Sequence, residues 1–467
     1  MLKLFNSLGR SLEEFVPCTD GEVRMYTCGP TVWNYAHIGN LRTFVFEDVL
    51  RRYLKFKGYK VFQVMNITDV EDRIIKGIKE TGKPLAEHTR FYEAAFMEDL
   101  AALFVERAEK YPRATEHVQE MVALIKVLLQ KGFAYTAPDG SVYFSVSKFP
   151  SYGALSGVRL DSLKSAGRVS TDHYEEKTEA ADFALWKSWD RDDGDVFWET
   201  ELGKGRPGWH IECSAMSMKY LGESFDIHTG GLDNKFPHHE NEIAQSESAT
   251  GKKFVKYWLH SDFLSVEGAE MHKSVGNVVY LRDLVKEGWS PRVVRTFLIS
   301  SHYRDRMDLT NAGLAQAKAL RERLQEFSRR LESVKGTSGS DGGGLGSEMA
   351  GGFEEAMDRD LNVPEALAAI FVVAKKTNLL IDGGKLSEQS AGEVLGALRR
   401  VDSVLGVLDF SPQELTSKEA ALLAAREEAR KRRDFAESDR LRKELLSLGV
   451  VVEDTPKGTR WKKPSSG

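Results

Sequence analysis

Cys28, Cys213, His238 and Glu242 form a set of side chains whose types could together hold a metal ion. Cys28 directly follows an expected strand, and Cys213 lies on an expected helix much later in the chain. His238 and Glu242 are four residues apart, which places them on one face of a single helix. Thiolate, imidazole and carboxylate groups are all zinc ligands. Because no CxxC pair is present, ordinary packing of two buried cysteines stays open as the alternative.

A second group of residues could bind phosphate. The segment CGPTVWNYAHIGN places His37 and Asn40 directly before an expected helix, where backbone N–H groups and the helix dipole attract anions. The segment AEMHKSVGN offers Lys273 and Ser274 beside a glycine. A capped helix with a surface histidine and a solvated loop lysine are the alternatives at these two places.

The elements around these residues follow the pattern of a parallel α/β sheet. Residues 22–27 predict a strand, residues 41–58 have the apolar spacing of a helix, and residues 59–68 predict a second strand. Ligands of such sheets lie beyond the carboxyl ends of the strands. The loop between Cys28 and Asn40 lies at such an end.

The same α/β pattern returns after an interruption. Residues 85–135 predict helices broken at Pro112, and an insertion of roughly 115–200 follows. A helix is then expected from Trp209, a strand over 225–232 and a helix that ends at Gly251. The Gly/Ser-rich stretch 336–352 predicts a flexible loop before further amphipathic helices, and a last unit begins at residue 414.

Composition limits the class of protein. With 467 residues, 41% hydrophobic and 29% charged, the chain has the size and make-up of several folded domains. No apolar run is long enough for a membrane helix, no secretory signal is recognisable, and three cysteines cannot form a disulfide framework, so a cytoplasmic protein is expected. The net charge is −5, but Arg426 to Gly467 carry 12 Lys/Arg against 8 Asp/Glu. A local basic face can bind nucleic acid, although a solvated helix is the commoner outcome.

Taken together and in order, these segments resemble one family, the cysteinyl-tRNA synthetases of class I. CGPTVWNYAHIGNLRT is similar to the HIGH region, GWHIECSAM and DIHTGGLDNKFPHHENEIAQSE to the zinc and substrate segments, and EMHKSVGN to the KMSKS loop. The ending EDTPKGTRW also resembles that of the family. The resemblance covers essentially the whole chain. It implies a Rossmann-type parallel-sheet catalytic domain with an insertion, followed by a mostly helical tRNA-binding region and a small C-terminal domain.

The resemblance also implies domain bounds and residue roles. The expected domains are a catalytic domain at 1–114 and 201–262, a connective insertion at 115–200, a KMSKS-loop and stem-contact region at 263–310, a helical bundle at 311–413 and an anticodon-binding domain at 414–467. One zinc ion is expected on Cys28, Cys213, His238 and Glu242, and the four-residue spacing to Glu242 favours His238 over His239. His37, Asn40 and Lys273 are the expected catalytic, ATP-binding residues, with Asp233 as a further ATP contact. Gly29, Thr68 and Trp209 are expected around the cysteine, and Arg430, Phe435, Asp439, Asp454 and Trp461 against tRNA.

The implied reaction activates L-cysteine with ATP and Mg²⁺ to cysteinyl-adenylate and then transfers it to tRNA-Cys. An apolar pocket separates cysteine from serine by only ~1–3 kcal/mol, whereas zinc strongly prefers a thiolate to a hydroxyl. No editing domain is therefore expected. The protein is also expected to be a monomer.

The sequence departs from the family at the KMSKS loop. Glu270 stands where the first lysine is usual, and His272 follows before the retained Lys273. A glutamate beside a triphosphate would repel it unless the side chain points away or holds Mg²⁺. Two alternatives remain open: a cysteine ligase with an amino-sugar acceptor, of the mycothiol-pathway type, and a non-catalytic tRNA-binding paralogue.

Overall fold

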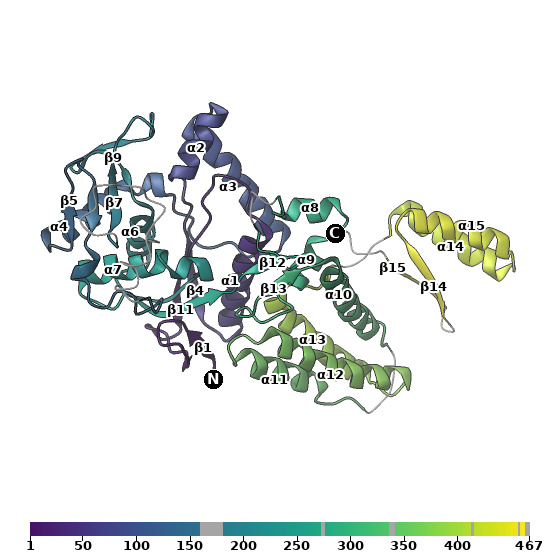
Figure 1. Cartoon of the computed structure of the whole chain (residues 1–467). Coiled ribbons are helices and arrows are strands. Elements are labelled where there is room, and N and C mark those ends of the chain that lie inside the picture. The colour runs from purple at the N-terminus through teal and green to yellow at the C-terminus, as the bar shows by residue number, and fades with distance from the viewer. Residues whose placement is uncertain (159–180, 272–275, 336–340, 412–414, 456–457, 463–467) are drawn as a thin grey trace. The chain divides into compact units, whose positions relative to one another are not determined.

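The computed structural model describes residues 1–158, 181–271, 276–335, 341–411, 415–455 and 458–462 (Figure 1). The chain divides into two compact units, Met1–Gly406 and Val407–Gly467. Among the described residues, no helix is long and apolar enough to cross a membrane.

A four-stranded parallel sheet lies at the centre of the first unit, in the order β11-β10-β3-β4. Its strands are β3 (Glu22–Thr27), β4 (Lys60–Met65), β10 (Phe225–Gly231) and β11 (Val255–Ser261). Helix α1 (Ile38–Phe56) connects β3 to β4. All three strand pairs run parallel, so the predicted strand–helix–strand unit is confirmed.

Helix α1 begins three residues before the expected start because the chain caps it there. His37 Nδ1 accepts the backbone N–H of Asn40, and the Asn40 side chain accepts the backbone N–H of His37. This reciprocal capping stabilises the first turn. Leu41, Phe44 and Val45 are buried against the sheet, as their helical spacing predicts.

The insertion carries an antiparallel sheet of its own, in the order β5-β6-β7-β9-β8. Its elements are α4 (Val118–Gln130), β5 (Ala134–Thr136), β6 (Val142–Phe144), β7 (Phe183–Ser188), β8 (Trp198–Thr200) and β9 (Gly203–Pro207). This sheet thus continues past residue 200, up to the glycine that precedes α6 (Trp209–Leu221). One continuous hydrophobic core joins the insertion to the parallel sheet and to α7 (His238–Thr250).

Eight further α-helices of the first unit lie among the described residues. They are α2 (Asp72–Thr81), α3 (Leu85–Ala102), α8 (Leu281–Lys286), α9 (Pro291–Leu298), α10 (Asn311–Glu332), α11 (Leu345–Met357), α12 (Val363–Asp382) and α13 (Glu388–Leu405). The strand pairs β1 (Lys3–Asn6) with β2 (Ser11–Glu14) and β12 (Leu264–Val266) with β13 (Met307–Leu309) complete it.

The prediction of a flexible loop over residues 336–352 is wrong for the second half of this segment. Residues 336–340 lie outside the described residues, but Leu345 begins helix α11. Leu345, Met349 and Phe353 recur every four residues and are all buried. This apolar stripe outweighs the helix-weakening glycines between them.

The second unit is a helix pair with a hairpin: α14 (Ser417–Lys431), α15 (Phe435–Ser447), β14 (Val451–Thr455) and β15 (Gly458–Lys462). Helices α14 and α15 are separated at Arg433, whose φ of +61° is left-handed. Leu445, Val450 and Val452 form its small core.

Candidate active site

A cavity of about 350 Å³ opens at the carboxyl ends of the parallel strands. Cys28 directly follows β3, Asn66 follows β4 and Gly231 ends β10. Nine of the predicted site residues line it: Cys28, Gly29, His37, Asn40, Thr68, Trp209, Cys213, Asp233 and His238. The fold therefore brings His37 and Asn40 to the same cavity as the metal-type donors Cys28, Cys213 and His238.

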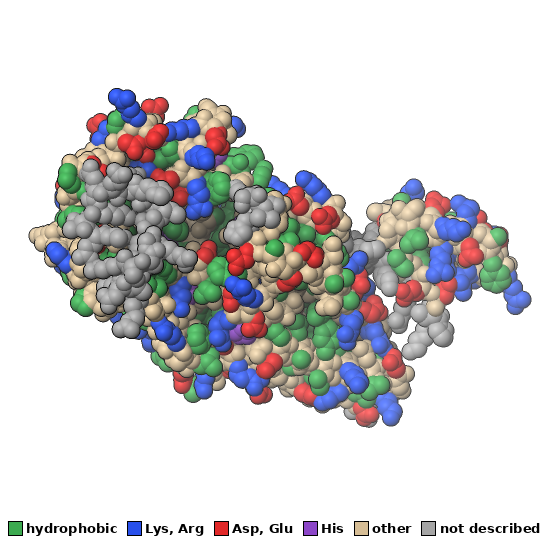
Figure 2. All heavy atoms as spheres, viewed as in Figure 1, with side chains coloured by type: hydrophobic (Ala, Val, Ile, Leu, Met, Phe, Trp, Pro, Cys, Tyr) green, Lys and Arg blue, Asp and Glu red, His purple; other side chains and the backbone are tan. Residues whose placement is uncertain are grey.

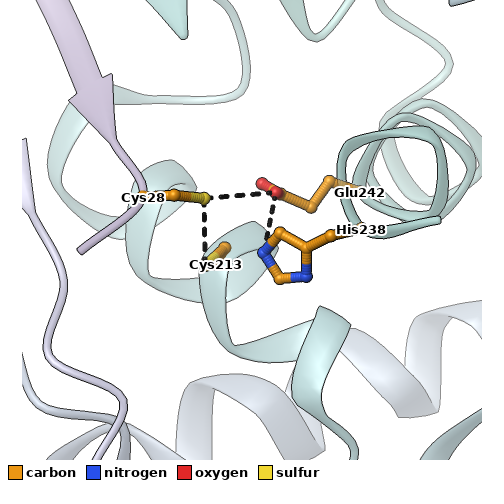
Figure 3. A group of neighbouring side chains, drawn as sticks. All are labelled: Cys28, Cys213, His238 and Glu242. Carbon is orange, nitrogen blue, oxygen red and sulfur yellow. Dashed lines mark hydrogen bonds and ion pairs between the residues drawn. The ribbon is translucent and has the colours of Figure 1, made fainter. Parts of the chain in front are cut away.

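Four side chains with zinc-type donor atoms converge at this cavity (Figure 3). Cys28 Sγ lies 3.9 Å from Cys213 Sγ and 3.8 Å from Glu242 Oε1, and His238 Nε2 lies 3.2 Å from the same Oε1. Tetrahedral zinc with bonds of about 2.0–2.3 Å holds its donor atoms roughly 3.3–3.8 Å apart. The four residues thus already have the dimensions of such a site.

A second set of donors lies next to the first. Cys28 and Glu242 also cluster with His228 and His239, and His239 Nε2 is 3.3 Å from Cys28 Sγ. The cavity wall includes Cys213 and His238 but neither His228 nor His239. Because a metal that binds substrate must face the cavity, the geometry favours the first set.

Among the first set, the neutral ring of His238 can bind a cation directly, whereas the two thiols would ionise only when a cation is bound. Burial lowers the pKa of His238 to about 3, so its ring is neutral. His238 Nδ1 lies 2.9 Å from His210 Nδ1, which lets His238 carry its proton there and turn the Nε2 lone pair toward the cluster. Burial also raises the pKa of the Cys28 and Cys213 thiols. A metal ion would supply the positive charge that makes them thiolates.

A chain of hydrogen bonds runs behind the cavity wall. The Gly29 N–H donates to Asn66 Oδ1 (2.9 Å), Asn66 Nδ2 donates to Thr68 Oγ1 (3.1 Å), and the Thr68 hydroxyl donates to Glu212 Oε2 (3.0 Å). Glu212 is fully buried, and burial raises the pKa of its carboxyl group. Because the Thr68 proton is directed to Glu212, a lone pair of the Thr68 oxygen remains for a donor in the cavity.

Gly29 itself has no room for a side chain. A Cβ at this position would lie 1.7 Å from the backbone oxygen of Asn66. The close approach of the two backbones therefore requires glycine.

His37 is oriented by the helix that follows it. Its Nδ1 accepts the Asn40 N–H at 3.2 Å, which assigns the ring proton of the neutral imidazole to Nε2. The Ile38 N–H is bonded to the Val279 oxygen at 2.9 Å. The side chain of His37, rather than these two N–H groups, is then the donor that this helix start offers to an anion.

The altered KMSKS loop is described in part. Lys273 and His272 lie outside the described residues. The Glu270 carboxylate lies 3.5 Å from the guanidinium of Arg306, and the Glu270 backbone oxygen accepts from Asn277 Nδ2. Glu270 thus has a partner of opposite charge.

The second unit carries the residues expected against tRNA. Phe435 is 62% exposed and Asp439 is exposed, whereas Trp461 packs on the small core. Asp454 is bonded to Arg426 at 2.7 Å and to Arg430 at 2.5 Å, so it stabilises this unit. Figure 2 shows Lys and Arg side chains over much of the face of this unit.

Sequence reasoning missed several residues of the site. His210, His228 and His260 are buried around the donor cluster, and Asn66 and Glu212 form the hydrogen-bond chain. His210 and Glu212 lie on α6, His228 on β10, His260 on β11 and Asn66 directly after β4, so the fold brings these segments together.

Three family profiles match the chain. Residues 14–319 match the tRNA synthetases class I (C) catalytic domain, residues 352–409 the DALR domain and residues 413–461 the cysteinyl-tRNA ligase anticodon binding domain.

Many known proteins are similar over their full length. The cysteine–tRNA ligase of Chlamydia muridarum is 45% identical over 99% of both chains. Those of Protochlamydia amoebophila and Solibacter usitatus are 45% and 46% identical, over 99% of this chain and 98% and 99% of theirs.

Solved structures of other synthetases share the fold at low identity. Methionyl-tRNA synthetase of Mycobacterium tuberculosis, in complex with methionyl-adenylate, has a TM-score of 0.60 at 15% identity over 83% of this chain and 90% of its own. The leucyl enzyme of Agrobacterium radiobacter, in a ternary complex with tRNA, has a TM-score of 0.59 at 13% identity over 84% of both chains.

Proposed function

The chain belongs to the cysteine–tRNA ligase family, and on that premise we propose that its cavity activates L-cysteine with ATP while one zinc ion selects the thiol. The observation that carries this is the position of the donor cluster. Cys28, Cys213 and His238 line the same cavity as His37 and Asn40. A thiol-binding metal and the phosphate-binding helix start would then face one substrate pair.

The reaction has two steps. The cysteine carboxylate attacks the α-phosphorus of ATP, pyrophosphate leaves, and cysteinyl-adenylate remains in the cavity. A terminal ribose hydroxyl of the tRNA then attacks the carbonyl carbon and releases AMP. The class I catalytic domain accounts for the activation of cysteine with ATP, and the anticodon-binding domain accounts for the use of tRNA.

Cys28, Cys213, His238 and Glu242 are the residues that would hold zinc. The two thiols, the neutral imidazole and the carboxylate form a normal zinc donor set. When bound, zinc would lower the pKa of the substrate thiol and favour its sulfur over the serine hydroxyl. Glu242 is fully buried, so it completes the cluster from the side away from the substrate.

The remaining wall would orient the cysteine. The lone pair of Thr68 Oγ1 would accept from the substrate ammonium group, because the Thr68 hydroxyl proton is directed to Glu212. Trp209 stacks on His238 with ring centroids 4.2 Å apart, which holds the imidazole in place. Gly29 allows the substrate to approach the backbone.

His37, Asn40, Asp233 and Lys273 would bind ATP, with Mg²⁺ on its phosphates. His37 donates from Nε2 and Lys273 adds positive charge as negative charge grows on the leaving pyrophosphate. The backbone N–H of Asn40 supports this by donating to His37 Nδ1, and Asp233 lines the same cavity.

The second unit would read the anticodon through Arg430, Phe435, Asp439 and Trp461. The exposed ring of Phe435 suits stacking on a base. Asp454 contributes by holding Arg430 in place. We further propose a monomer in a reducing cytoplasm, which the unpaired cysteines support.

The two alternatives are less well supported. An amino-sugar acceptor would give no use to the anticodon-binding domain at residues 413–461. A non-catalytic paralogue was suggested by Glu270 and His272. The Arg306 side chain balances the charge of Glu270, and His272 lies outside the described residues.

Cysteine-dependent exchange of pyrophosphate into ATP tests the first step, and charging of purified tRNA-Cys tests the second. We expect both activities with cysteine and neither with serine. Absence of exchange would contradict activation, and exchange without charging would favour the ligase with another acceptor.

A further inference from the structure

Four aromatic rings and one arginine gather at one wall of the cavity. Tyr35 precedes α1, Phe91 and Tyr92 lie on α3, and Tyr280 and Arg282 lie at the start of α8. Tyr35, Tyr92 and Tyr280 line the cavity itself, and Phe91 beside them is 52% exposed. We call these five residues the aromatic rim.

The rings of the rim pack edge-on around Tyr35. Its centroid is 5.3 Å from that of Tyr92 at 84°, 6.0 Å from Tyr280 at 69° and 6.1 Å from Phe91 at 64°. T-shaped contacts fix rings without covering both of their faces. The rim is therefore ordered and still has aromatic surface to offer.

Arg282 adds a fixed positive charge. Its guanidinium lies 4.0 Å from the centre of the Tyr35 ring and pairs with Asp99 of α3 at 3.0 Å. Figure 1 shows α8 beside α3, and Figure 2 shows hydrophobic side chains exposed along α3. Arg73 lines the same cavity; its side chain is 54% exposed and pairs with Glu71 at 3.1 Å.

Exposed aromatic faces beside arginines suit one class of partner. A single-stranded nucleic acid presents base faces that stack on such rings and phosphates that arginines attract. The second step of the reaction brings the unpaired 3′ end of tRNA into this cavity.

We propose that the aromatic rim stacks the bases at the 3′ end of tRNA and so guides the terminal ribose to the adenylate. The proposal rests on the proposed function, because it assumes that tRNA is the acceptor. Phe91 is the outermost ring, and Tyr35 with Arg282 forms the inner layer against the cavity.

The test uses the full-length protein and tRNA-Cys in which the base next to the terminal adenosine is replaced by 2-aminopurine, whose fluorescence falls on stacking. Phe91→Ala removes the outer ring, Phe91→Trp restores a stacking surface, and Leu12→Ala changes a residue of like exposure (53%) on β2. We expect Phe91→Ala to weaken quenching and to raise the KM for tRNA about tenfold, the effect of losing one stacked base. Phe91→Trp and Leu12→Ala should retain quenching.

The readouts distinguish failure of the rim proposal from failure of the proposed function. If Phe91→Ala quenches and charges like the parent protein, the aromatic rim does not bind the 3′ end. A change in charging that Phe91→Trp fails to rescue also contradicts stacking. If the parent protein performs no cysteine-dependent exchange, the proposed function fails instead.

Discussion

Replacing Thr68 with valine tests the cysteine pocket because the change removes one hydroxyl and little volume. Thr68 Oγ1 accepts from Asn66 and donates to Glu212, and its remaining lone pair is the proposed acceptor for the substrate ammonium. A hydrogen bond to a charged group contributes about 1.5–3 kcal/mol. At 1.4 kcal/mol per factor of ten, the KM for cysteine should rise about 10- to 150-fold. The KM for ATP should change much less.

Pyrophosphate exchange at varied cysteine and ATP concentrations measures both constants. Thr68→Ser keeps the hydroxyl and should retain most of the affinity. Thr377→Val is the matched control, since Thr377 is also fully buried but lies on α12, where its hydroxyl bonds the Val373 oxygen. A Thr68→Val protein with the parent KM for cysteine would refute the assigned role.

Glu47 is a fully buried carboxylic acid of helix α1. Burial raises the pKa of Glu47 above its usual 4.5. Its contribution to stability is therefore present below pH 4.5, and the free energy of unfolding falls at higher pH by about 1.4 kcal/mol per pH unit. In urea unfolding between pH 5 and 8, Glu47→Gln should flatten this slope, whereas Glu355→Gln, which changes an exposed side chain, should not. Gly29→Ala should abolish exchange while circular dichroism stays native-like, because its Cβ would lie 1.7 Å from the Asn66 oxygen; retained exchange would contradict the tight backbone approach. Lys273→Ala should slow exchange on the order of 100-fold with little change in cysteine affinity, and an unchanged rate would refute its role.

The parts of the fold that follow from local sequence were predictable. Residues 22–27 and 225–231 form strands, and α7 ends at Gly251 as expected, because apolar patterns and a left-handed glycine cap determine them. The prediction of a loop over 345–352 was wrong because it weighed the glycines above the apolar stripe that forms α11. Spacing also could not show that α14 and α15 separate at Arg433.

The site was predictable only through the family resemblance. One turn of helix relates His238 to Glu242, but Cys28 and Cys213 join them through the parallel sheet and α6, which no local pattern reveals. Glu212 was next to a predicted ligand and still unassigned, because its partner Thr68 lies on another segment. The aromatic rim is likewise assembled from three separate segments.

The most direct test of the account is the metal content and amino-acid selection of Cys213→Ser. Cys213 is buried at the cavity, whereas Cys18→Ser changes the exposed third cysteine and serves as the control. Zinc is measured by mass spectrometry of the purified proteins, and exchange is measured with cysteine and with serine. The account predicts less than one zinc per chain and a reduced preference for cysteine in Cys213→Ser only. Full zinc occupancy with unchanged selection would contradict it.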